Sequence, residues 1–370
     1  MLEQLQPAID ALNAQDYRKA AKLLKQLQKQ SPNHPWVQFY IGRWYEGTEK
    51  FTAAEKVYRQ LLRQATNPKV ITQARQGLQR IETQEQDQRQ AAIASAKTDP
   101  QNSEPGLLIL EPIPHDRKPK IAQKLARMLK TDAYTARMQL QSRGWRLYRT
   151  GDMAELQVYG LEMQQAGIPV FWVSLKQIQQ VHVFRVQYCQ SFTPQPTVIC
   201  QNQQDQLGSL TFNWSEVSQR VDGLLPLLME AFDYDPRRSR TERFRHKQTT
   251  QDHANIFDLH LPKRRSILRF YDQTYDFQQG VKLSENTDRM TTTRLNWKYL
   301  TDVFNQQLKT IKNWSEFTSF AETSLDYTQL LGRFPNCVNH SNQEQTLWEA
   351  AFHLYSTLVF LKGMGQHHEV

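Results

Sequence analysis

The sequence contains little cysteine and lacks a long hydrophobic run. Its cysteines are odd in number and without metal-ligand spacing, which excludes a disulfide framework and favours reduced thiols: Cys189, Cys200 and Cys337. The longest apolar stretch near the end of the chain, residues 354–361, is far shorter than the about 20 residues of a transmembrane helix. Residues 1–7 lack the basic and apolar regions of a signal peptide. Together these absences predict a cytoplasmic protein.

The sequence also lacks the motifs of the common enzyme classes. It has no phosphate-binding loop, no zinc-protease histidine pair and no nucleophile elbow. His246, His253 and His260 recur every seven residues, and Asp252 and Asp258 lie among them. Residues 258–261 have the sequence pattern of a strand, so the seven-residue spacing does not align the histidines on one helix. Because these motifs are missing, we predict no metal, no cofactor and no enzymatic activity. The competing hypothesis of an enzyme without a local motif would require a deep pocket that gathers His253, His260 and Asp258.

What the chain does have is length, glutamine and positive charge. A chain of 370 residues is expected to form two or three domains. Hydrophobic residues make up 39%, below the usual ~45–50%, but the 11% of aromatic residues suffices for packed cores. The 45 glutamines are spread through every segment, which indicates polar, uncharged helix surfaces rather than a prion-like tract. Lys and Arg exceed Asp and Glu by 46 to 37, a net charge of +9.

An internal repeat with an offset of 34 residues occupies the first part of the chain. Four positions have an apolar partner one period later: Tyr17 and Phe51, Ala20 and Ala54, Leu24 and Tyr58, Leu27 and Leu61. Apolar residues at i, i+3, i+4 and i+7 predict amphipathic helices here. Gly42 allows two helices to approach closely, and Pro32 ends the first copy. A further apolar-periodic segment, residues 70–81, is expected to pack as a cap helix.

Residues 1–83 therefore resemble a tetratricopeptide-repeat array. The resemblance implies paired helices whose concave face binds peptides or protein surfaces. Gln38 and Tyr45 lie on the first helix of the second pair and are the candidate partner-binding residues. The alternative is that two repeats only stabilise the chain or mediate dimerisation.

The pattern changes after residue 83. Residues 84–106 are predicted to be a linker because the apolar periodicity fails and a Pro- and Ser-containing stretch follows. The alternative for residues 82–88 is an extension of the cap helix. Residues 107–174 then alternate between strand-like and helix-like segments, which predicts a small β-α-α-β-α-β module. In its last helix, Asp152 and Glu155 are placed as a capping box and Gly167 as the residue that ends the helix.

This module resembles the C-terminal domain of the bacterial ribosomal stalk protein and the related adaptor that feeds substrates to a AAA+ protease. The matching stretches are 120–124, 133–137 and 154–170. The resemblance implies a docking domain in which Lys120 and Lys124, on the first helix, recruit a partner. Thr131 and Asp132 stand where that family has glycines.

Residues 175–370 are predicted to form an α+β region. Strands are expected at 181–186, 197–200, 210–214 and 266–271, and helices at 297–311 and 345–362. The stretch 210–225 resembles bacterial pleckstrin-homology-like barrels. The complete fold class is thus multidomain: all-α helical repeats, then the small module, then the α+β region.

Most of the net charge is concentrated in residues 237–269, where ten Lys and Arg face three Asp and Glu. Nine of these cations are the candidate anion-binding residues: Arg237, Arg238, Arg240, Arg243, Arg245, Lys247, Lys263, Arg264 and Arg265. They would bind nucleic-acid phosphates, an anionic membrane surface or an acidic protein partner. The remaining interpretation is a solvated surface loop.

The function predicted from the sequence is that of a non-catalytic protein–protein interaction adaptor, or an assembly or regulatory factor of a larger complex. The alternative is a regulator that binds nucleic acid or an anionic membrane surface through residues 237–269. The glutamine-rich composition and the overall plan resemble those of uncharacterised cyanobacterial repeat proteins. The sequence leaves the partner and the oligomeric state open.

Overall fold

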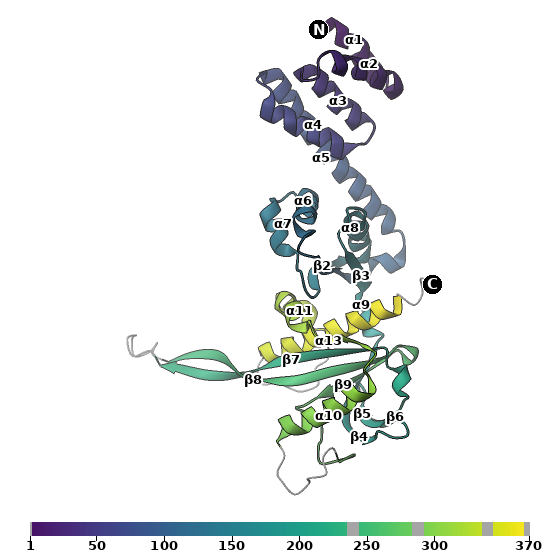
Figure 1. The fold of residues 1–370 in the computed structure, drawn as a ribbon, viewed down its shortest axis with the longest axis vertical. Helices are drawn as coiled ribbons and strands as arrows, with labels where there is room; N and C mark the ends of the chain where they lie inside the picture. The colour runs from purple at the N-terminus through teal and green to yellow at the C-terminus, as the bar shows by residue number, and fades with distance from the viewer. Residues whose placement is uncertain (1, 235–243, 283–291, 335–342, 366–370) are drawn as a thin grey trace. The chain divides into compact units, whose positions relative to one another are not determined.

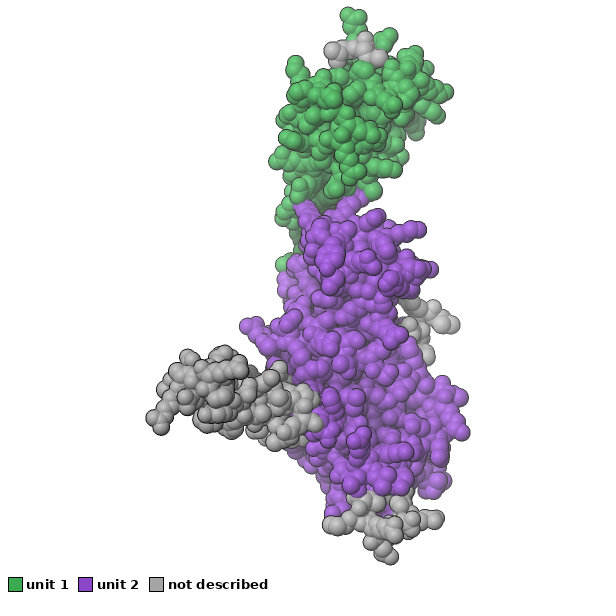
Figure 2. Space-filling model, turned by 60° about the vertical axis from the view of Figure 1, so that its left-hand side comes forward, with its two compact units in different colours: residues 1–98 green, residues 99–370 purple. Residues whose placement is uncertain are grey.

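The computed structural model describes residues 2–234, 244–282, 292–334 and 343–365. The chain divides into two compact units, Met1–Thr98 and Asp99–Val370, which are coloured separately in Figure 2. The small module and the α+β region, predicted as separate domains, thus belong to one unit.

Unit 1 consists of helices that pack in successive antiparallel pairs (Figure 1). Their bounds are α1 Leu2–Asn13, α2 Tyr17–Gln30, α3 Pro35–Gly47, α4 Phe51–Gln64 and α5 Pro68–Ala96. Residues one repeat apart are buried to the same degree: Ala20 and Ala54 are both fully buried, and Leu24 and Tyr58 are nearly so. The 34-residue offset therefore reflects equivalent core positions, as the sequence indicates.

Helix α5 extends through most of the predicted linker. In the segment expected to be the cap, Val70, Ala74 and Ile81 of α5 are buried against α4. The helix then continues to Ala96 and is followed by a short 3₁₀ turn, Pro100–Ser103. The prediction of a linker from residue 84 was wrong as far as Ala96, because Gln, Glu, Arg and Ala are strong helix formers that need no apolar face when a helix is exposed.

Unit 2 begins with a three-stranded antiparallel sheet in the order β2-β1-β3. Its strands are β1 Pro105–Leu110, β2 Arg146–Asp152 and β3 Val170–Ser174, and its helices are α6 Lys118–Leu129, α7 Ala133–Gln139 and α8 Met153–Gln165. Leu108 and Leu110 of β1 pack against these helices, whereas Leu107 and Ile109 face the opposite core. The small sheet is therefore buried on both faces.

The ends of α8 agree only in part with the predicted caps. Gly167 has a positive φ of 76° just after the helix, as expected for a terminating glycine. Asp152 lies at the N-cap, but its side chain makes no capping hydrogen bond. Glu155 instead accepts a hydrogen bond from Arg149 of β2 at 2.6 Å. The carboxylate predicted to complete a capping box thus ties the helix to the sheet.

The rest of unit 2 is built on a seven-stranded mixed sheet with the order β10-β7-β8-β9-β4-β5-β6. Its strands are β4 His182–Ser191, β5 Thr197–Gln201, β6 Leu207–Thr211, β7 Gln219–Tyr234, β8 Phe244–Leu261, β9 Ser266–Tyr271 and β10 Lys312–Trp314. Strands β6 and β10 are opposite edges of an open sheet. The expectation of a pleckstrin-homology-like barrel at residues 210–225 was therefore wrong, because β7 leaves β6 and pairs with β8 in a long hairpin.

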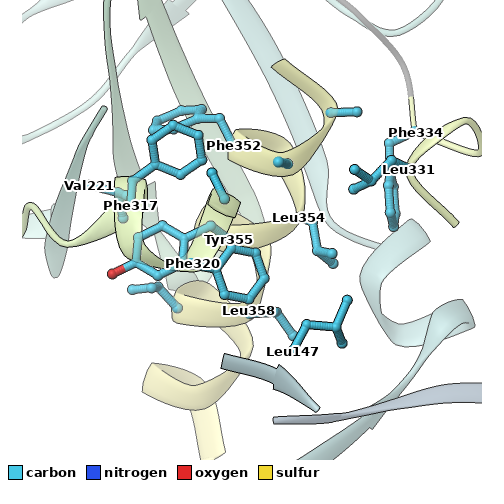
Figure 3. Packing of buried hydrophobic residues seen from close by; sticks show 14 of the residues in the cluster. Leu147, Val221, Phe317, Phe320, Leu331, Phe334, Phe352, Leu354, Tyr355 and Leu358 are labelled. Atoms are coloured by element: carbon cyan, nitrogen blue, oxygen red, sulfur yellow. The ribbon is translucent and has the colours of Figure 1, made fainter. Parts of the chain in front are cut away.

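Helices cover both faces of this sheet (Figure 1). Helix α10, Thr293–Gln307, lies on one face; α11, Phe317–Ser324, and α13, Gln343–Gly365, lie on the other with the shorter helices α9 Leu175–Gln179 and α12 Thr328–Leu331. Figure 3 shows the core around α11 and α13, where Leu147 of β2 and Val221 of β7 contribute to one cluster. Since the small sheet and the large sheet share this core, there is no domain boundary at residue 174.

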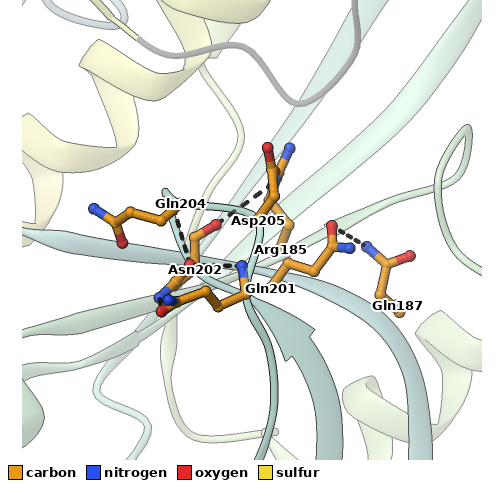
Figure 4. A network of polar contacts seen from close by, with 7 residues as sticks. Arg185, Gln187, Gln201, Asn202, Gln204 and Asp205 are labelled. Atoms are coloured by element: carbon orange, nitrogen blue, oxygen red, sulfur yellow. Dashed lines mark hydrogen bonds and ion pairs between the residues drawn. The ribbon is translucent and has the colours of Figure 1, made fainter.

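A polar network holds the turn between β5 and β6 (Figure 4). The side-chain oxygen of Asn202 accepts hydrogen bonds from the backbone amides of Gln204 and Gln206, both at 2.9 Å. Asp205 has a positive φ of 59° and forms an ion pair with Arg185 of β4. Glutamine side chains also take part, because the Gln187 amide donates to Gln201 at 3.3 Å and the Asn202 amide donates to Gln206 at 2.9 Å.

Candidate protein-binding site

Helix α3 carries the largest group of half-buried aromatic side chains in unit 1. Trp36, Tyr40 and Trp44 are spaced four residues apart, and Tyr45 follows; we call these four residues the α3 aromatic cluster. The rings of Trp36 and Tyr40 stack with centroids 6.2 Å apart and planes at 27°. The rings of Trp44 and Tyr45 lie 4.9 Å apart. Half-buried Trp and Tyr side chains that are held in place by their neighbours are typical anchors of protein interfaces.

The position of α3 is fixed by Tyr58 of α4. A Cβ atom at Gly42 of α3, or at Gly77 of α5, would lie 2.5 Å from the Tyr58 ring, so both glycines are needed for the ring to fit. The Tyr58 hydroxyl donates to Glu46 of α3 at 2.7 Å, and Arg80 of α5 donates to the same carboxylate at 2.7 Å. Burial, followed by the charge of Glu46, raises the pKa of Tyr58, so the hydroxyl stays a donor. These contacts join three consecutive helices.

The two predicted partner-binding residues on α3 are largely engaged within unit 1. The side-chain amide of Gln38 donates to the carbonyl of Pro32 at 2.5 Å and borders a cavity of about 50 Å³ next to α4. Tyr45 packs against both hydrophobic clusters of the unit, as Trp36 and Tyr40 also do, and all three side chains are half-buried. The sequence-based prediction did not include Trp36 and Tyr40. Their spacing of four residues was a usable signal, because it places both rings on one side of a helix whose core residues lie between them.

The candidate lysines of α6 differ from one another. Both side chains are exposed, but the ammonium group of Lys124 donates to the carbonyl of Ala166 at 2.6 Å, where α8 ends. A cation at this place stabilises the helix terminus. Lys120 makes no such contact with the part of the chain that the structure describes. Nearby α7 presents two large side chains that the sequence analysis overlooked, Tyr134 at 73% and Met138 at 64% exposure.

The described residues of the basic segment lie in separate places along β8 and the turn that follows it. Arg237, Arg238, Arg240 and Arg243 lie outside the described residues. Arg245 and Lys247 belong to one end of β8, whereas Lys263, Arg264 and Arg265 follow its other end. Sixteen residues of extended strand separate Arg245 from Leu261, on the order of 50 Å.

Two cations of this segment, Arg264 and Arg269, are paired with carboxylates. Arg264 donates two hydrogen bonds to Glu216 at 2.7 and 2.9 Å. Arg269 is buried, with 1% exposure, and donates two hydrogen bonds to the fully buried carboxylate of Asp258 at 3.0 and 2.8 Å. Part of the local excess of positive charge is thereby neutralised, at the surface for Arg264 and inside the protein for Arg269.

The predicted histidine and aspartate residues do not form a catalytic pocket. His253 is exposed, while His260 and Asp258 are completely buried. The Nε2 atom of His260 is 3.0 Å from the Ser356 hydroxyl of α13. Burial, and next the charge of Arg269, lowers the pKa of His260 to about 3. The described residues contain no group of three His, Cys, Asp or Glu side chains arranged to hold a metal ion.

Comparisons with known proteins concern only the N-terminal unit. No curated protein and no solved structure matches the chain, so the resemblances to the stalk protein domain and to cyanobacterial repeat proteins gain no support. Within the described ranges, no helix is both long and apolar enough to cross a bilayer. Residues 11–72 match the tetratricopeptide-repeat family. Together with the equivalent burial of residues 34 positions apart, this match shows that the N-terminal helices form a tetratricopeptide-repeat segment.

Proposed function

We propose that this protein is a non-catalytic adaptor whose tetratricopeptide-repeat unit binds a protein partner through the α3 aromatic cluster. The observation that carries the proposal is the match of residues 11–72 to a repeat family whose members commonly mediate protein–protein interaction. We also propose that the adaptor takes part in the assembly or regulation of a larger complex.

The aromatic cluster supplies the contact chemistry. Its rings are half-buried, and their orientations are set by stacking and by the hydrogen bond from the Trp44 indole to the carbonyl of Tyr17 at 3.0 Å. A partner that covers such rings gains apolar burial at a low cost in side-chain entropy.

The charge of unit 1 favours an acidic partner. Residues 1–98 contain fifteen Lys and Arg against nine Asp and Glu, a net charge of +6. Two of these cations lie at the cluster. The Lys50 ammonium is 5.4 Å from the centroid of the Trp44 ring. Burial raises the pKa of Tyr40, and the nearby positive charge of Arg43 partly offsets that rise. We therefore expect a partner segment that combines carboxylates with aliphatic or aromatic side chains.

The test is quantitative mass spectrometry of proteins that co-purify with the tagged full-length chain from cells that produce it. Three forms are compared: the wild type, Trp36→Ala/Tyr40→Ala, and Tyr134→Ala/Met138→Ala as a control that removes the exposed pair of α7. Truncation of interface anchors costs about 2 kcal/mol or more each, so a partner should be depleted at least tenfold with the α3 variant.

Two outcomes would contradict the proposal. One is a partner that the α3 variant retains and the α7 variant loses, which would place docking on unit 2. The other is equal recovery with all three forms. Arg43→Glu, which truncates no ring of the cluster, serves as a second α3 variant if the aromatic truncations lower the melting temperature.

A further inference from the structure

Unit 2 contains a cavity of about 920 Å³ that none of the sites described above uses. It lies where the first turns of α10 meet strands β7 and β8, and residues of β10 and α11 close one side. Its volume is in the range of small-molecule sites, ~300–1,000 Å³.

The floor of the cavity is the α10 face of the large sheet. Residues of β7 alternate between the two faces, and Leu224 pairs with Asn255 in the β7–β8 register. Leu224 is 50% exposed, and Leu295 of α10 is 38% exposed; both line the cavity. They are two of six large hydrophobic side chains that are exposed among the described residues. The cavity thus concentrates apolar surface that would gain from being covered.

One arginine of the cavity is already neutralised. Arg220, with 7% exposure, donates to Asp222 at 2.6 Å and to Asn305 at 2.9 Å, and its guanidinium lies 4.4 Å from the centroid of the Phe257 ring. The other oxygen of Asp222 accepts from Asn313 at 2.7 Å. This pair, a buried arginine and a half-buried aspartate, shapes the wall and leaves no net charge.

Two cations remain uncompensated. Arg294 and Lys298 lie one turn apart on α10, and Thr301 and Asn305 continue the same stripe of the helix along the cavity. Neither cation forms an ion pair or a hydrogen bond with the part of the chain that the structure describes. Among the lining residues that the structure describes, Asp222 is the acid and Arg220 balances it, so the described lining carries a net charge of +2.

We propose that this cavity binds a small organic anion with an apolar body, whose acidic group is held by Arg294 and Lys298 and whose body rests on Leu224 and Leu295. A phosphate on a flat ring and a carboxylate on an alkyl chain share this chemistry. The site is independent of partner binding by unit 1.

Two dyes that differ by one acidic group test the proposal on the full chain. 8-Anilinonaphthalene-1-sulfonate has apolar rings and a sulfonate, and N-phenyl-1-naphthylamine has the same rings without it. We expect saturable binding of the sulfonate dye at one site, at least tenfold tighter than binding of the neutral dye.

Charge reversal locates the site. Arg294→Glu/Lys298→Glu should weaken binding of the sulfonate dye at least tenfold and leave the neutral dye unchanged. The matched control Lys309→Glu/Arg333→Glu makes the same change in charge at exposed positions outside the cavity and should have no effect. Leu224→Glu should weaken both dyes. If the reversed chain folds poorly, Arg294→Gln/Lys298→Gln gives the same comparison.

Equal loss of sulfonate-dye binding in the reversal and in its control, or equal affinity for the two dyes, would overturn the proposal.

A competition experiment distinguishes the two ligand types, since adenosine monophosphate offers a phosphate on a flat ring and decanoate offers a carboxylate on an alkyl chain. Displacement of the sulfonate dye by either supports the site, and displacement by neither would refute it.

Discussion

Replacing Gly42 by alanine should destabilise unit 1, and the effect should reverse its sign when Tyr58 is shortened. The added methyl group would lie 2.5 Å from the Cε1 atom of the Tyr58 ring. The ring cannot move away, because Gly77 approaches its other edge equally closely, with a virtual Cβ 2.5 Å from Cε2. Overpacking of this kind costs about 1–3 kcal/mol, and we take the upper end because the ring is enclosed on both sides.

Alanine also stabilises a helix interior by about 1 kcal/mol relative to glycine. The expected net change for Gly42→Ala is therefore a loss of about 2 kcal/mol. In a Tyr58→Leu background the ring atoms are absent, so only the helix propensity remains and Gly42→Ala should stabilise by about 1 kcal/mol. The coupling between the two positions is thus about 3 kcal/mol.

Native-state hydrogen exchange of α4 amides, measured by mass spectrometry on the full chain, reports the local free energy of opening separately from unit 2. Gly77→Ala should show the same coupling to Tyr58 from the other side of the ring. An equal destabilisation by Gly42→Ala in both backgrounds would refute the reasoning, because the clash would then not involve the ring.

Three further predictions concern unit 2. Burial lowers the pKa values of His260 and His353 to about 3, so the stability that these neutral histidines allow above pH 6.5 should be lost as the pH falls. The free energy of unfolding in urea should decrease by about 3 kcal/mol between pH 7.5 and 5.5, and a flat profile would argue against the burial of the two histidines. Arg269→Met should cost about 3–5 kcal/mol by leaving the Asp258 carboxylate buried without its arginine, and Asp258→Leu/Arg269→Met should recover most of that loss in the same assay. Burial raises the pKa of the Cys189 thiol to about 12, so iodoacetamide at pH 8 should modify it only after unfolding, and rapid labelling of the folded chain would contradict this.

The repeat unit could be predicted in detail because its information is local. Each helix shows its apolar face in the sequence, and the offset of 34 residues places Ala20 and Ala54 at the same depth. The orientation of side chains on α3 could not be predicted in this way. Whether Gln38 points to a partner or to the carbonyl of Pro32 depends on the packing of α2 against α3.

The organisation of unit 2 escaped prediction because it depends on contacts distant in sequence. The strand at Ser266–Tyr271 was correctly expected, but nothing local indicates that β9 lies between β8 and β4. The apolar side chains of β1 point to two cores, and periodicity alone does not tell which core belongs to the same domain. The net charge of residues 237–269 was a poor guide to a binding surface for a related reason, because Arg269, at the end of this segment, is buried and paired with Asp258.

The affinity of a co-purified partner for the full chain tests the central claim most directly. The dissociation constant of that partner should rise by at least tenfold for Trp36→Ala/Tyr40→Ala and stay unchanged for Tyr134→Ala/Met138→Ala. An unchanged dissociation constant for the first variant would show that the α3 aromatic cluster does not bind the partner.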